Sequence, residues 1–150
     1  MRKIHLFLSA AIMWLFLFSA SLPVKDEPSS SKQDSSRYSI DNCVNTFNPA
    51  DIESTKAGYQ YWFADKKFAD GKTVKLSVVR PNEATHPPHR HAEDEFFFVL
   101  EGKAGFFLNG KTRIAGPYTS LYCPSNMEHG IRNVGDTELK YLVIKKYKTP

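Results

Sequence analysis

The chain has 150 residues, which is enough for one domain with a hydrophobic core but hardly enough for two. Its formal charge is +4, but without Arg2 and Lys3, which we expect to be removed, 18 Lys and Arg face 16 Asp and Glu. This near-neutral balance argues against a general nucleic-acid or anionic-membrane binding surface, and we expect no nucleic-acid partner. Eleven Phe and seven Tyr favour a β-rich fold. The one basic cluster, 145–148, is interpreted as a solvated strand end.

The first 21 residues have the layout of a secretory signal peptide. Arg2 and Lys3 precede an apolar run from 4 to 18, and small residues follow it. The alternative is an uncleaved anchor, but the run is short for the roughly 20 residues of a membrane-spanning helix and His5 lies within it. We therefore expect an exported protein, periplasmic or secreted, without stable membrane anchoring.

A linker and one short helix are expected next. Residues 22–37 are rich in Ser and charge and poor in apolar side chains, which predicts a flexible linker ahead of a domain at 38–150. Near the start of that domain, Asn48 is a suitable helix N-cap, Pro49 suits the first helical position, and Gly58 would end the helix.

From Gly58 onward, short aromatic and β-branched segments separated by turns predict strands. Asn109-Gly110 is a strong hairpin signal, because both residues tolerate positive φ. Many short strands at close intervals indicate an all-β sandwich or small barrel. The segments expected to form strands are 59–64, 72–80, 95–102, 103–116 (a hairpin), 120–123, 130–133 and 139–147.

Two cysteines, Cys43 and Cys123, suit an oxidising compartment in number. A disulfide between them would tie the N-terminal arm to the rest of the domain. The sequence does not show that the two sulfur atoms meet, so a pair of buried thiols is an equal alternative.

Three histidines lie within six residues, at 86–91, just before a predicted strand. His89 and His91 are two residues apart, so on an extended chain their side chains point to the same face. Glu95 follows at the start of the strand, where a hairpin would bring its carboxylate back beside the two imidazoles. These ligand types suit a divalent metal. His129, in a turn before another strand, is the better candidate for a fourth ligand, and His86 is taken as a residue of the rim.

This part of the sequence resembles the cupin family. The first cupin motif is His-x-His, three residues, Glu, six residues and Gly, and the second has Pro, His and Asn at set spacings. Glutamate, tyrosine and asparagine replace glycines that are usual in these motifs, at 83, 118 and 126, but Asn tolerates positive φ. The resemblance covers roughly 73–146. The matching residues are His89, His91, Glu95, Gly102, Pro124, His129 and Asn133.

The resemblance implies a six- to eight-stranded antiparallel β-barrel of the jelly-roll type with one divalent transition metal inside it. Family members use iron, manganese, nickel, zinc or copper, and this set of ligands does not choose among them. The metal ligands implied by the motifs are His89, His91, Glu95 and His129.

Strand 95–102 carries aromatic residues on both of its faces. Phe97 and Val99 share the face of Glu95 and should line the barrel interior, whereas Phe96 and Phe98 point the other way. Dimers are common among cupins, so a homodimer could cover this second face, and a helical arm is the alternative.

Function is less determined, because cupins include dioxygenases, isomerases, decarboxylases, lyases and binding modules. We expect an exported metal-dependent oxidoreductase or isomerase that acts on a small oxygen-rich or aromatic molecule. The alternative is a non-catalytic module that binds a metal or a small ligand. Catalytic residues are not assigned from the sequence; candidates for further residues of the site are Arg80, His86, Tyr122 and Tyr141.

Overall fold

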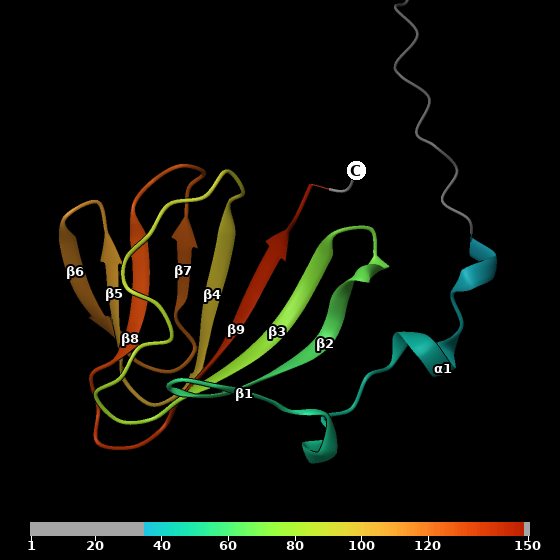
Figure 1. The fold of residues 1–150 in the computed structure, drawn as a ribbon, viewed down its shortest axis with the longest axis horizontal. Coiled ribbons are helices and arrows are strands. Elements are labelled where there is room, and N and C mark those ends of the chain that lie inside the picture. Colours follow the sequence, from blue (N-terminus) through green and yellow to red (C-terminus); the bar gives the residue numbers. More distant parts are fainter. Residues whose placement is uncertain (1–34, 149–150) are drawn as a thin grey trace, which may run out of the picture. The chain divides into compact units, whose positions relative to one another are not determined.

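The computed structural model describes residues 35–148 (Figure 1). The expected signal peptide, 1–21, and nearly all of the expected linker, 22–37, lie outside the described residues. The chain divides after Arg37, and the described end of the first unit is a single 3-10 turn, Ser35–Arg37. In the described part of the chain, no helix is both long and apolar enough to cross a membrane.

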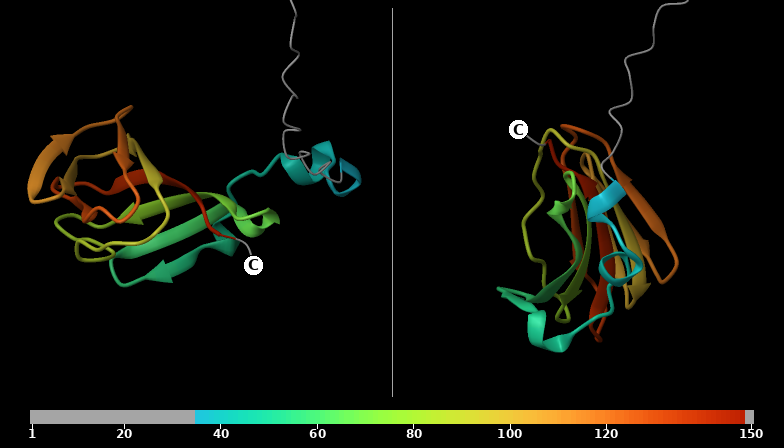
Figure 2. Two further views of the ribbon diagram at one scale, coloured as in Figure 1. Left: turned by 90° about the horizontal axis from the view of Figure 1, so that it is seen from above. Right: turned by 90° about the vertical axis from the view of Figure 1, so that its right-hand side faces the viewer.

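The unit that begins at Tyr38 is built from two antiparallel sheets, which confirms the expected all-β fold (Figures 1 and 2). One sheet has the strand order β1-β2-β3-β9-β4-β7, and the other has the order β6-β5-β8. The strands are β1 (Glu53–Thr55), β2 (Gly58–Ala69), β3 (Lys72–Val79), β4 (Glu95–Glu101), β5 (Ala104–Leu108), β6 (Lys111–Ala115), β7 (Ser120–Cys123), β8 (His129–Asn133) and β9 (Leu139–Lys146).

The core lies between the two sheets, on the face that β4 turns inward. Phe97 and Val99 are buried, as expected from their alternation with Phe96, which is 44% exposed. Paired residues on β7 and β9, Tyr122 and Ile144, are equally exposed on this outer face. A homodimer that covers the outer face therefore stays a prediction.

The helix expected after Asn48 forms only its first turn. Asn48 caps a 3-10 turn, Pro49–Asp51, by accepting a hydrogen bond from the Ala50 N–H at 3.1 Å. The prediction that the helix continues to Gly58 is wrong, because the chain turns into β1 and pairs with β2 instead. A short, exposed helix is only marginally stable because its nucleation is costly, whereas pairing with β2 gives the backbone of β1 regular partners. An unpredicted helical turn, α1 (Ile40–Cys43), precedes this region.

The expected turn chemistry is present. Asn109 and Gly110 join β5 to β6 with φ values of 46° and 82°, which confirms the predicted hairpin. Tyr118 and Asn126, which replace usual motif glycines, both have a φ of 59°. The chain thus keeps these left-handed conformations with other residues, and at Tyr118 the side chain avoids packing strain by being exposed.

The two cysteines fit neither of the alternatives considered for them. Both are free; Cys43 is exposed on α1, whereas Cys123 is buried at the end of β7. The prediction of a disulfide and the prediction of two buried thiols are therefore both wrong for this pair.

Gly102, the last residue of the first motif, offers a test of the fold. Its φ is 85°, and a Cβ atom here would lie 2.4 Å from the Glu138 carbonyl oxygen. We expect Gly102→Ala to lower the free energy of unfolding by about 2–4 kcal/mol, from strain plus steric overlap. Gly110→Ala is the matched control: its φ is 82° but no atom lies within 4 Å. It should lose only about 1–2 kcal/mol. If urea denaturation gave the two variants equal losses of unfolding free energy, the predicted steric overlap at Gly102 would be contradicted.

Candidate metal centre

The four side chains predicted as ligands meet in space. His89 and His91 lie on the loop before β4, Glu95 begins β4, and His129 begins β8. The centroids of the three imidazole rings are 4.7–5.4 Å apart. The Glu95 Oε1 atom lies 3.0 Å from His129 Nε2 and 3.5 Å from His91 Nε2. We call these four residues the quartet.

Backbone hydrogen bonds hold the loop of the first motif against the turn of the second. The N–H groups of His89 and His129 each donate to the carbonyl of the other, at 2.9 and 3.0 Å. The N–H of Asn126 donates to the carbonyl of His91 at 2.8 Å, and the Ser125 hydroxyl donates to the carbonyl of Ala92. Ligands 40 residues apart in the sequence are thereby fixed side by side.

The three imidazoles are oriented in the same way. Each Nδ1 atom lies within hydrogen-bond distance of a backbone carbonyl two residues away, and a carbonyl can only accept, so Nδ1 carries the proton. In a neutral imidazole this leaves Nε2 with its lone pair, which is the state that binds metals. The pairs are His89 with Pro87 at 3.2 Å, His91 with Glu93 at 2.7 Å, and His129 with Met127 at 2.8 Å.

The Nε2 atoms fit a metal ion. His91 Nε2 is buried and has no hydrogen-bond partner among the described residues, a situation that costs about 1–3 kcal/mol in a folded protein. His129 Nε2 lies within hydrogen-bond distance of Glu95 Oε1, at 3.0 Å, and because a carboxylate only accepts, either a proton on Nε2 or a metal cation lies between the two atoms. Three imidazole nitrogens and one carboxylate oxygen suit several divalent transition metals.

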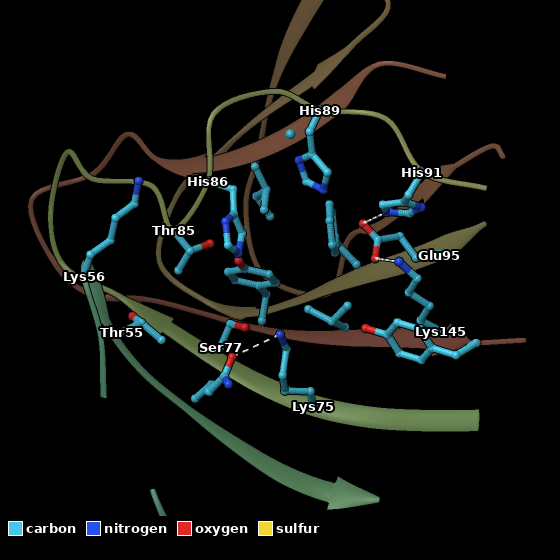
Figure 3. A pocket seen from close by; sticks show the side chains of 17 residues that line it. Thr55, Lys56, Lys75, Ser77, Thr85, His86, His89, His91, Glu95 and Lys145 are labelled. Carbon is cyan, nitrogen blue, oxygen red and sulfur yellow. Dashed lines mark hydrogen bonds and ion pairs between the residues drawn. The ribbon is translucent and has the colours of Figure 1, made fainter. Parts of the chain in front are cut away.

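The quartet opens onto a cavity of about 510 Å³ (Figure 3). Of the four further candidates from the sequence, His86 and Tyr141 line this cavity. Arg80 and Tyr122 do not: Arg80 forms a 2.9 Å ion pair with Glu83, and Tyr122 lies on the outer face of its sheet. Arg80 lies just beyond the end of β3, and Tyr122 occupies the outer face of β7, and the sequence pattern resolved neither position.

Two titratable groups beside the quartet stay protonated. Burial raises the pKa of the Cys123 thiol to about 12, and Cys123 forms with Glu95 and His129 a second group of side chains close enough to hold a metal. Burial also raises the pKa of the Tyr141 hydroxyl, which shares hydrogen bonds with Thr85 and Ser77. Tyr141 is therefore a neutral hydrogen-bond donor in the cavity.

His86 differs from the quartet histidines. Partial burial lowers the pKa of His86, and its neighbour His89 adds to this by charge repulsion. Its ring centroid is 5.8 Å from that of His89. It is thus a neutral imidazole at the rim of the cavity, as expected from its position outside the motif.

The lysines of the cavity were missed in the sequence. The cluster 145–148 was interpreted as solvated, but Lys145 is only 9% exposed, and its Nζ lies 3.7 Å from Glu93 and 4.0 Å from Glu95. Lys75 also lines the cavity, from the inward face of β3. Lys75 shares a face of β3 with the buried Thr73 and Ser77, whereas the sequence pattern would turn the apolar Val74, Leu76 and Val78 inward, so alternation alone did not indicate Lys75.

Comparisons with known proteins agree with this architecture. A family model described as a cupin domain matches residues 75–145. Polyketide synthase CurC of Streptomyces cyaneus is 34% identical over 65 residues, which cover 43% of this chain and 42% of that protein. Dimethylsulfoniopropionate lyase DddQ of Ruegeria pomeroyi is 32% identical over 66 residues, which cover 43% of this chain and 33% of that protein. The chain thus matches less than half the length of these curated relatives.

Solved structures share the fold. The structure of the polyketide cyclase RemF from Streptomyces resistomycificus superposes with a TM-score of 0.59 at 22% identity, covering 71% of this chain and 82% of that one. Cupin relatives therefore include enzymes, and cupins commonly bind a metal. The match of the cupin-domain model over residues 75–145, together with the two antiparallel sheets, shows a small cupin-type domain in this chain.

Proposed function

We propose that the chain is a metal-dependent enzyme that acts on a small oxygen-rich or aromatic molecule. The quartet would hold one divalent transition metal. The observation that carries this proposal is the buried, unpartnered Nε2 of His91, set among imidazoles whose Nδ1 atoms are already bound. The cavity in front of it, about 510 Å³, is of the size that binds small molecules.

The residues around the quartet have two roles: apolar side chains exclude water, and polar side chains donate or accept protons. The apolar side chains of Phe97, Ile131 and Val143 line the cavity and lower its polarity. Tyr141 can donate a hydrogen bond, and His86, as a neutral imidazole, can accept a proton. A metal bound here would polarise a substrate oxygen or take part in chemistry with dioxygen.

The shortage of carboxylates argues for an oxidoreductase or isomerase over a hydrolase. Among the described residues that line the cavity, Glu95 is the one carboxylate, and it belongs to the quartet. No carboxylate among these residues is then free to activate water, and His86 at the rim is the imidazole left to accept a proton. The same shortage supports a second candidate function, a non-catalytic module that binds a metal or a small ligand.

The metal assignment is tested by His91→Ala, with His86→Ala as the matched control from the same loop. We expect near-stoichiometric metal in the wild type and in His86→Ala, and less than about a tenth of it in His91→Ala, because a three-ligand site binds far more weakly. Elemental mass spectrometry measures the metal, and circular dichroism checks that the variants fold. Full metal content in a folded His91→Ala protein would overturn the assignment.

Catalysis is tested by incubating the metal-loaded protein with small aromatic and sugar-acid compounds, with and without dioxygen. We expect product in the wild type and none in His91→Ala. A dioxygenase should need both dioxygen and a redox-active metal, whereas an isomerase should work without dioxygen. Saturable binding with no product under any condition would reject the enzyme and favour the binding module.

We also propose that the protein is exported and that residues 1–21 are removed. The support is the order of basic, apolar and small residues in that segment. When the full chain is expressed in a secretion-competent bacterium, we expect an exported form whose intact mass lacks the first 20 or 21 residues. A full-length mass in the cytosol alone would contradict export.

A further inference from the structure

The charges that line the cavity are unbalanced. Three lysines and one carboxylate line it, and the carboxylate, Glu95, is already part of the quartet. Figure 3 shows Lys75 on the wall of the cavity across from His89 and His91. The cavity therefore carries excess positive charge, which a divalent cation in the quartet would increase. Such a cavity favours an anionic ligand.

Lys145 and Lys75 differ in whether a carboxylate of the protein pairs with their charge. Lys145 has carboxylates within 4.0 Å, from Glu93 and Glu95. The Nζ of Lys75 donates to the neutral Gln60 Oε1 at 3.1 Å and lies 5.0 Å from the ring of Trp62. Within the described residues, no carboxylate lies within 4.0 Å of Lys75, so its charge is not paired inside the protein.

The position of Lys75 makes this lack of a partner costly. Its side chain is partly buried, and burial lowers its pKa, which the more distant Glu95 and Glu53 only partly oppose. An ammonium group removed from water without a counter-ion is unfavourable. A ligand carboxylate beside Lys75 would supply the missing negative charge.

The surroundings of Lys75 suit the rest of such a ligand. Ser77 follows two residues later on the same face of β3, and its hydroxyl belongs to the hydrogen-bonded group with Tyr141 and Thr85. Gln60 adds an amide on the neighbouring strand. An acid that also carries other oxygens would find donors and acceptors here.

We propose that Lys75 determines the specificity of this cavity by binding the carboxylate of a small organic acid at the wall opposite the quartet. The inference rests on the proposed function only in that the ligand enters this cavity. It adds the substrate class, a carboxylic acid, and the residue that selects it.

Matched pairs of probes test this assignment by isothermal titration of the metal-loaded protein. D-glucuronate is compared with D-glucose, and salicylate with salicyl alcohol, so that each acid differs from its partner at the carboxylate. We expect at least one acid to bind about tenfold or more tightly than its neutral partner, as a charge-assisted hydrogen bond would give. In Lys75→Met that preference should disappear, while metal content and the affinity for the neutral partner stay unchanged.

Lys72→Met is the control, because Lys72 lies on the same strand but is exposed and outside the cavity. It should keep the preference for the acid. If neither acid binds more tightly than its neutral partner, or if Lys75→Met keeps the preference, the proposal is wrong. Elemental analysis of the same samples separates this failure from that of the proposed function, which fails if the wild type holds no metal.

Discussion

Two reciprocal backbone hydrogen bonds between His89 and His129 are the interaction on which the candidate site depends. They join a loop that lacks regular structure to the first residue of β8. Together with the bonds from Asn126 to His91 and from Ser125 to Ala92, they hold the histidines of the loop in register with the sheet. Because both partners are also members of the quartet, the contact that closes the fold is the contact that assembles the ligands.

The same loop shows how the chain directs lone pairs inward. Each ring nitrogen that faces the backbone is bound by a carbonyl close to it in sequence, so ring orientation is set locally. The distances between rings, in contrast, are set by pairing between distant strands. Local carbonyl contacts thus determine which ring nitrogen faces the metal site. Pairing between distant strands determines where that nitrogen lies.

Much of the site could be predicted because its geometry is local in the sequence. The spacing of His89 and His91 puts both on one face of an extended chain, and the turn at Asn109-Gly110 has few other conformations open to it. The prediction of a helix from Asn48 to Gly58 was wrong because capping residues indicate where a helix begins. They do not indicate which other structure competes with its continuation. Pairing of β1 with β2 is such a competitor, and it arises from tertiary contacts.

The cavity lysines were missed for a related reason. Lys145 belongs to a run of basic residues that looks solvated, and only its pairing opposite Glu95 in β4 turns it inward. Lys75 alternates with the apolar residues of β3, so the sequence pattern would turn it outward, and its role depends on what lies across the cavity, which no single strand shows. Residues that act through a distant partner need the three-dimensional arrangement before their chemistry can be argued.

The link between His89 and His129 also makes the stability of the folded chain depend on the concentration of the metal ion. In an unfolded chain, bringing the two imidazoles together would cost the closure entropy of the loop between them, so an ion finds the full quartet only in the native state. Any cation that occupies the quartet therefore shifts the folding equilibrium by mass action. The lifetime of this protein against proteases would then rise and fall with the local concentration of that ion.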